Sequence, residues 1–228
     1  VLDLHTVYDI IKNNKKLELS DESRVNIENA RNYLDKKMLE NIKPIYGVNT
    51  GFGSLCNVKI SNEKLTELQE NLVMSHACGT GSLISKPIIR LMLLLKIQSL
   101  SYGHSGVSLQ TVQRLIDFYN EDILPVIYEQ GSLGASGDLA PLAHLSLPLI
   151  GKGEVYFKDE RLPAGEVLQM FEWEPVKLQS KEGLALLNGT QFMSAHGIHA
   201  LLESYKLSYL ADVISAISID AFNCNMSP

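Results

Sequence analysis

The stretch GSLGASGDLAPLAH, residues 131–144, carries the most specific chemical signal in the sequence. At its centre stand Ala135, Ser136 and Gly137. If the amide nitrogen of Gly137 attacks the carbonyl carbon of Ala135 and water leaves, the tripeptide closes into a five-membered imidazolone ring. Loss of the Ser136 hydroxyl as a second water then leaves an exocyclic methylene. This methylene is a strong electrophile of a kind that no ordinary side chain provides.

The residue types suit this cyclisation. Glycine lacks a Cβ, so the nitrogen of Gly137 can approach a carbonyl in backbone conformations closed to other residues. Alanine crowds the attacked carbon little, and serine carries a leaving group on Cβ. We expect Asp138 to open a helix with Pro141 in its first turn, which places the loop at the positive end of a helix. The triplet Ala-Ser-Gly alone would also fit an ordinary turn before a helix. The interpretation as a ring-forming site therefore depends on the whole stretch 131–144.

A second glycine-rich segment, IYGVNTGFGSL at 45–55, contains Tyr46. It lacks the G-x-x-x-x-G-K-[ST] pattern, so it does not predict a phosphate-binding loop. By itself the segment fits a buried tyrosine in a glycine turn equally well. To act as a base near neutral pH, Tyr46 would need its pKa lowered from the usual value of about 10.

Two further motifs hold side chains that can bind a polar ligand. MSHACGTG, residues 74–81, places His76 at the end of an expected helix, and EGLALLNGTQ, residues 182–191, stops a helix at Asn188. That stop leaves the Asn188 amide able to point into a cleft instead of capping its own backbone. If each motif stood alone, a structural interpretation would be favoured over a binding site. His76 would be a packed core histidine, and Asn188 would be part of an ordinary Asn-Gly helix stop.

Together, the four motifs resemble those of the aromatic amino acid ammonia-lyases, and most closely the members that act on histidine. The resemblance implies that residues 135–137 form the prosthetic group 4-methylidene-imidazol-5-one (MIO) without a metal. It also implies that Tyr46, as a phenolate, removes the substrate's β-proton. In the same family pattern, His76 faces the substrate imidazole and Asn188 holds the substrate's amino or carboxylate group.

The implied reaction converts L-histidine into trans-urocanate and ammonia, the opening step of histidine breakdown. Two imidazoles can pair as hydrogen-bond donor and acceptor, which favours histidine as the substrate. Some tyrosine-specific relatives also carry Ser-His at 75–76, so a tyrosine or phenylalanine ammonia-lyase, or an aminomutase, remains an alternative. A folding or assembly module without activity is another.

Composition narrows the class of partner. The chain has 228 residues and a net charge of −6, which argues against nucleic acid or an anionic membrane and leaves small neutral or zwitterionic ligands open. Its three cysteines, at 56, 78 and 224, form no C-x-x-C pair, so a reducing cytoplasm fits best. The longest apolar run, residues 87–100, is interrupted by Arg90 and Lys96 and is too short to span a bilayer.

Apolar periodicity predicts a mainly α-helical fold. Alternation at 151–162 predicts one small hairpin, and helices are expected over 3–13, 20–38, 61–76, 87–100, 108–119, from about 164, from 181 after a Ser180 cap, and from 190 onward. With the family resemblance, this implies the N-terminal portion of an L-aspartase/fumarase-like fold, with a small β-containing region around the MIO loop.

Residues 205–222 are apolar nearly all round, and a helix of that kind must be buried on every side. We therefore expect residues 1–228 to be the N-terminal portion of a longer lyase whose C-terminal half completes the covering. The resemblance implies a homotetramer at full length, with active sites that combine residues from several subunits.

The remaining histidines receive weaker interpretations. His196, His199 and Glu203 follow an i, i+3, i+7 spacing that could seat a metal, but an amphipathic helix face explains them as well, and no metal is expected. His5, His104 and His144 are assigned no role in the reaction, but His144 lies within residues 131–144 and is expected to support the helix that follows the loop.

Overall fold

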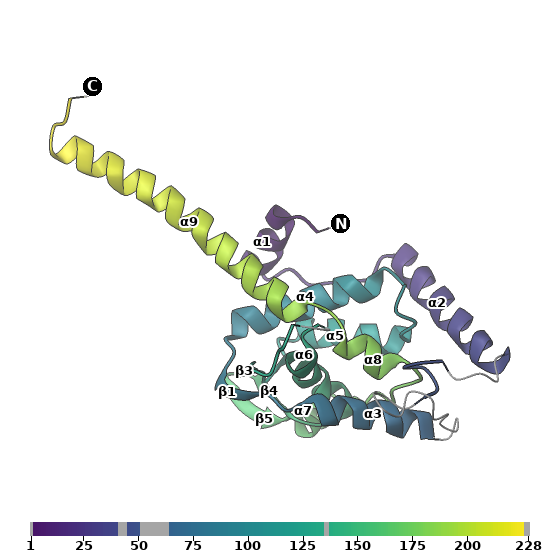
Figure 1. Cartoon of the computed structure of the whole chain (residues 1–228). Helices are drawn as coiled ribbons and strands as arrows, with labels where there is room; N and C mark the ends of the chain where they lie inside the picture. Colours follow the sequence, from purple (N-terminus) through teal and green to yellow (C-terminus); the bar gives the residue numbers. More distant parts are fainter. Residues whose placement is uncertain (1, 41–44, 51–63, 135–136, 226–228) are drawn as a thin grey trace.

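The computed structural model describes residues 2–40, 45–50, 64–134 and 137–225. Over these residues the chain is mainly helical, as predicted (Figure 1). The helices are α1 (Leu4–Lys12), α2 (Asp21–Glu40), α3 (Leu65–His76), α4 (Lys86–Ser101), α5 (Leu109–Asn120), α6 (Leu139–Ser146), the 3-10 helix η3 (Leu147–Ile150), α7 (Ala164–Met170), α8 (Glu182–Leu187) and α9 (Gln191–Ala221). The strands are β1 (Thr80–Leu83), β2 (Leu124–Pro125), β3 (Tyr128–Gln130), β4 (Glu154–Phe157) and β5 (Glu160–Pro163).

Local sequence signals set the start of several helices. The Oδ1 of Asp3 accepts a hydrogen bond from the Thr6 amide at 2.7 Å, and the Ser108 hydroxyl accepts one from the Thr111 amide at 3.3 Å. Ser20 caps α2 through the Ser23 amide at 3.2 Å. The predicted helix starts near residues 3, 20 and 108 are thereby confirmed. The expected start at Ser61 lies outside the described residues.

The predicted cap of α8 is wrong. Ser180 does not cap this helix, because its hydroxyl accepts a hydrogen bond from Nη2 of the buried Arg31, at 3.0 Å. Instead, the Glu182 carboxylate folds back onto the chain and accepts a hydrogen bond from the amide of Gln179 at 2.7 Å. The contact between Ser180 and the distant Arg31 therefore replaces the local cap that the sequence predicted.

Helix α4 forms the centre of the hydrophobic core. Its apolar side chains are buried on nearly every side, and it packs against α2, α5 and α9. The interpretation of residues 87–100 as a buried helix is confirmed. None of the helices in the described part of the chain is long and apolar enough to cross a membrane.

Two small antiparallel sheets lie beside the helices. The predicted hairpin is confirmed as β4 and β5, and β2 extends it into a three-stranded sheet. The pairing of β1 with β3 was not predicted, because neither short strand shows a clear alternation. Since β3 ends at Gln130, this second sheet leads directly into the loop at 131–138.

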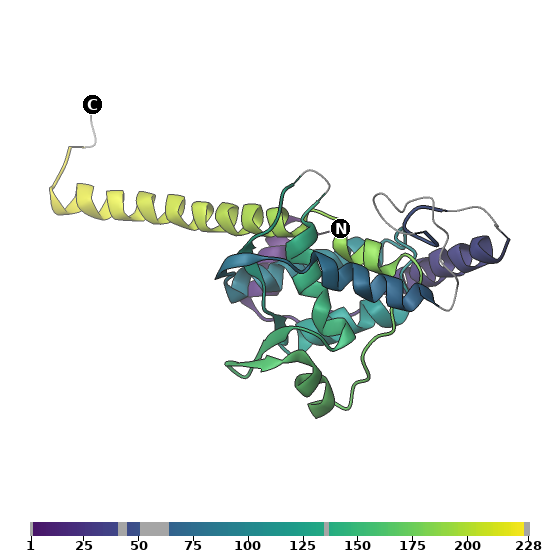
Figure 2. The ribbon, with the colours of Figure 1, turned by 60° about the horizontal axis from the view of Figure 1, so that its bottom comes forward.

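Helix α9 begins in the body of the protein and then projects away from it (Figure 2). Its buried residues are Gln191 and Ala195, in the first part of the helix. Every residue from 203 to 225 is exposed, so the described residues do not provide the burial expected for 205–222. The reason is geometric, because the helix runs past the last element able to cover it.

Candidate active site

Gly137 packs directly against the break between α8 and α9. Its φ is +98°, and a Cβ at this position would lie 2.7 Å from the Gly189 oxygen and 3.0 Å from its nitrogen. A side chain there would therefore meet backbone that cannot move aside easily. Ala135 and Ser136, the other two ring-forming residues of the prediction, lie outside the described residues.

Asp138 ties the loop to two neighbouring segments. Its amide donates to the Gly189 oxygen at 2.8 Å. Its buried carboxylate accepts hydrogen bonds from the Ser132 hydroxyl at 2.8 Å and from the Met193 amide, in the first turn of α9, at 3.0 Å. Asp138 precedes α6 as predicted, but its carboxylate serves the amino end of α9 rather than capping α6.

Asn188 ends α8 and lies between the loop and α4. Its backbone is extended, with φ −83° and ψ 134°, and its oxygen accepts a hydrogen bond from the Lys96 ammonium at 3.0 Å. The side-chain amide makes a long contact of 3.5 Å to the Leu184 oxygen, so it is directed partly back toward its own helix. The predicted helix stop at Asn188 is confirmed, whereas the expected absence of a contact to its own backbone is not.

His76 is the last residue of α3, as predicted, and is half-buried. Its Nδ1 lies 2.9 Å from the Leu72 oxygen and 3.2 Å from the Ser75 hydroxyl. A carbonyl can only accept, so Nδ1 of His76 carries a proton and donates it to the Leu72 oxygen. Helix α3 packs against α6 and α8, which brings the element that ends in His76 to the elements that flank the loop.

Tyr46 lies in a turn at residues 46–49 and is 57 % exposed. The turn is closed by the Ile45 amide, which donates to the Asn49 Oδ1 at 2.7 Å, and Gly47 supplies a φ of +72°. The buried-tyrosine alternative is therefore not what the structure shows. Residues 51–55 of the same motif lie outside the described residues.

His144, which was expected only to support the helix after the loop, links the His76 motif to α6. Its Nε2 accepts a hydrogen bond from the Gly79 amide at 3.0 Å, and this requires an unprotonated Nε2. Burial lowers the pKa of His144, which favours that neutral form. In the sequence, the only indication of this contact was that His144 lies within the motif at residues 131–144.

Lys96 was also missed as a site residue. It is 1 % exposed, and its Nζ donates to the oxygens of Ala185 at 2.8 Å and Asn188 at 3.0 Å. The sequence signal was a lysine inside a helix that is otherwise apolar on nearly every side. Sequence reasoning used Lys96 only as evidence against a membrane span.

The metal interpretation of the α9 histidines gains no geometric support. Among the described residues, no three or more His, Cys, Asp or Glu side chains gather in a way that could hold a metal ion. The Nδ1 of His196 contacts the Phe192 oxygen at 3.0 Å, within its own helix.

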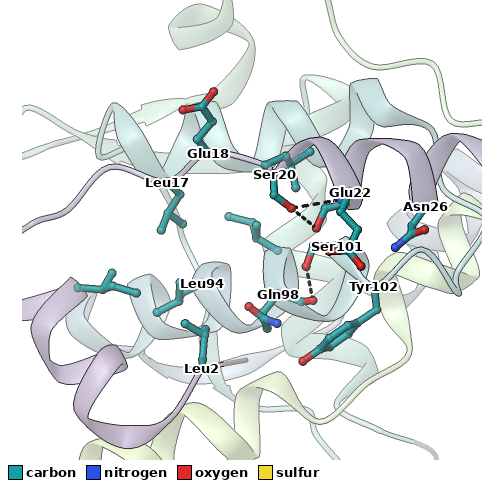
Figure 3. Close-up of a pocket in the computed structure, with 14 residues that line it drawn as sticks. Leu2, Leu17, Glu18, Ser20, Glu22, Asn26, Leu94, Gln98, Ser101 and Tyr102 are labelled. Carbon is teal, nitrogen blue, oxygen red and sulfur yellow. Dashed lines mark hydrogen bonds between the residues drawn. The ribbon is translucent and has the colours of Figure 1, made fainter.

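A pocket of about 520 Å³ lies elsewhere, between the N-terminal segment, α2 and α4 (Figure 3). Leucines form one side, including Leu17 and Leu94, while Glu22 and Gln98 contribute polar groups. None of Tyr46, His76 and Asn188 lines it. This pocket is therefore separate from the candidate site.

The chain is similar to known proteins over nearly its whole length. The family described as aromatic amino acid lyase matches residues 2–228. A curated histidine ammonia-lyase of Staphylococcus aureus (strain MSSA476) is 41 % identical over 222 residues, which cover 97 % of this chain and 44 % of that protein. The chain thus spans less than half the length of this curated relative.

Two solved structures have the same fold over nearly the whole chain. Histidine ammonia-lyase from Trypanosoma cruzi superimposes with a TM-score of 0.89 at 38 % identity, covering 98 % of this chain and 44 % of that one. Tyrosine aminomutase from Streptomyces globisporus also gives 0.89, at 34 % identity, covering 96 % of this chain and 41 % of that one. The expected fold is thereby confirmed.

Proposed function

This chain belongs to the aromatic amino acid lyase family, and we propose that it is the N-terminal, loop-bearing portion of a histidine ammonia-lyase. The reaction is elimination of ammonia from L-histidine to give trans-urocanate. The observation that carries this proposal is the seating of Gly137 on the Asn188–Gly189 break, because it joins two of the predicted motifs in one place.

The backbone around the loop fits the MIO group of the family. Gly137 adopts a conformation that side chains rarely adopt, in a space that a Cβ would fill. We propose that residues 135–137 form the ring with loss of two waters, its closing bond running from the Gly137 nitrogen to the Ala135 carbonyl carbon. When formed, the group would supply an electrophilic carbon derived from Ser136 to the substrate amine.

The remaining roles belong to side chains of this chain. Tyr46 removes the β-proton of the substrate as a phenolate, and its surface turn allows a partner element to cover it. Asn188 binds the amino or carboxylate group of the substrate. His76 offers Nε2 as an acceptor to the N–H of the substrate imidazole, since its own Nδ1 proton is engaged by Leu72.

A second candidate is a tyrosine or phenylalanine ammonia-lyase or aminomutase. The observation in its favour is that the tyrosine aminomutase superimposes as well as the histidine ammonia-lyase does. The identity to the histidine ammonia-lyase, 38 % against 34 % for the tyrosine aminomutase, favours histidine.

We further propose that the full-length protein is a homo-oligomer, a tetramer in the family pattern, in the cytoplasm. The support is the distal part of α9, where Tyr209, Ile217 and Phe222 are 70 %, 63 % and 83 % exposed. Large apolar side chains exposed along a helix are typical of a surface that another part of the full-length protein or a second subunit covers. The free thiols of Cys78 and Cys224 are consistent with a reducing compartment.

The test uses the full-length protein with L-histidine and L-tyrosine in parallel. We expect urocanate from histidine, a protein mass two waters below the encoded mass, and loss of both properties in Ser136→Ala. An unsaturated or rearranged product from tyrosine alone would favour the second candidate. A protein mass equal to the one that the sequence encodes, together with no turnover of either amino acid, would favour a folding or assembly module without activity.

A further inference from the structure

Lys96 is a buried cation in the core helix. Its ammonium reaches the carboxyl end of α8, where it donates to the oxygens of Ala185 and Asn188. Within the part of the chain that the structure describes, no carboxylate forms an ion pair with it. Two backbone carbonyls therefore take the place of a counter-ion.

Stability alone does not explain a lysine at this position. A charge removed from water without an opposite charge is costly, and burial lowers the pKa of Lys96 to about 7. Apolar residues of similar volume are often tolerated equally well at buried ionic positions. Neighbouring residues of α4, including Leu93 and Ile97, are apolar and buried, so a methionine would suit the surroundings.

The two carbonyls that Lys96 holds are ones that α8 cannot satisfy by itself. The last carbonyls of a helix lack intrahelical partners, and a cation there complements the helix dipole. At the amino end of the same short helix, the buried Glu182 carboxylate accepts hydrogen bonds from the Ser108 amide and the Thr111 hydroxyl, both at 2.7 Å. Helix α8 is thus held at both ends by buried side chains, Glu182 at its amino end and Lys96 at its carboxyl end.

Asn188 is the residue that this arrangement immobilises. Its oxygen is held by Lys96, and the next carbonyl, of Gly189, accepts from the Asp138 amide beside the loop. With the backbone fixed on both sides, the side chain of Asn188 leaves it in a defined direction. We propose that Lys96 is a positioning residue, which orients Asn188 toward the substrate by holding the carbonyls of Ala185 and Asn188. This inference rests on the substrate-binding role proposed for Asn188.

The test compares Lys96→Met with Lys181→Met in the full-length protein. Lys181 is a matched control, because its Nζ donates to the Ser105 oxygen at 2.9 Å from the amino end of α8. Amide hydrogen exchange over residues 184–190 is measured first, with α5 as the reference for global opening. We expect faster exchange in this segment for Lys96→Met and wild-type exchange for Lys181→Met.

The kinetic readout is the KM and kcat for L-histidine, normalised to the fraction of protein that has lost two waters. We expect Lys96→Met to raise KM about tenfold with a smaller effect on kcat, because substrate binding loses its oriented partner. Lys181→Met should leave KM within about twofold of wild type. If Lys96→Met does not fold, the same measurements on Lys96→Gln decide the question.

Unchanged exchange over 184–190, or an unchanged KM in an active enzyme, would overturn the proposal. A normal KM in Asn188→Ala would instead refute the binding role of Asn188. No turnover of histidine by the wild type would refute the proposed function. In both of these cases the exchange data still decide whether Lys96 fixes Asn188.

Discussion

The break at Asn188–Gly189 and the distal part of α9, residues 205–222, belong to one continuous stretch of chain but are stabilised in opposite ways. At the break, Lys96 of α4 and the amide of Asp138 beside the loop hold the backbone through hydrogen bonds. In the distal part of α9, apolar side chains project with no cover from the described residues. The first region is therefore held by contacts within the described residues, whereas the second lies exposed there, and we propose that a second subunit or the C-terminal half covers it.

The largest expected effect comes from Gly137→Ala, which breaks the seating of the loop. The new Cβ would lie 2.7 Å from the Gly189 oxygen, in a backbone conformation with φ +98°. We expect loss of the two-water mass deficit and at least about a hundredfold loss of turnover. Intact mass and kcat for histidine measure both.

Gly134→Ala is the control for this change. Gly134 has φ +75°, but a Cβ there would meet nothing within 4 Å. It should cost only backbone strain, roughly 1 kcal/mol, and should leave the mass deficit intact. Equal losses in the two variants would show that strain, and not contact with Gly189, controls the loop.

Glu182→Gln tests the amino end of α8. The fully buried carboxylate accepts three hydrogen bonds, and a glutamine would point its own N–H donors at some of those donors. We expect the free energy of unfolding to fall by about 2–3 kcal/mol, measured by denaturant titration. Glu166→Gln, at an exposed position of α7, should change it by less than about 0.5 kcal/mol. Similar losses in both variants would contradict a special role for the buried carboxylate.

A smaller effect is expected from pH at His144. Its pKa is lowered by burial, so below the unfolded value of about 6.5 the unfolded chain binds more protons than the folded one. Stability from this residue is therefore present above that value and is lost as pH falls through it. The wild type should lose more unfolding free energy between pH 7.5 and 5.5 than His144→Gln does. A parallel decline in both proteins would exclude His144 as a contributor.

The smallest effect on this chain alone is expected from Ile217→Lys in the distal part of α9. Ile217 is 63 % exposed, so the free energy of unfolding of the 228-residue chain should change by no more than about 0.5 kcal/mol. In the full-length protein the same change places a charge in the proposed interface, and analytical ultracentrifugation should show smaller species. An unchanged oligomer would place the interface elsewhere.

Much of the helical layout could be predicted because its signals are local. Asp3, Ser20 and Ser108 lie within a few residues of the amides they cap, and the apolar run of α4 shows its burial in its own composition. The prediction that Ser180 caps α8 was wrong because the Ser180 hydroxyl instead binds Arg31, which lies 149 residues away in the sequence and leaves no local signal. The β1–β3 pair was missed for the same reason, since its strands are short and meet across α4 and α5.

For the candidate site, the sequence by itself determined which atoms are available for reaction. The order Ala-Ser-Gly at 135–137 permits ring closure because the reacting groups are covalent neighbours, and the motifs at Tyr46, His76 and Asn188 carry the family resemblance. Only the tertiary structure decided how Asn188 is held. Lys96 and Asn188 are 92 residues apart, and their contact depends on the packing of α4 against the end of α8. Local patterns record chemistry and periodicity, whereas the compensation of a buried charge depends on which distant carbonyls the folded chain brings to it.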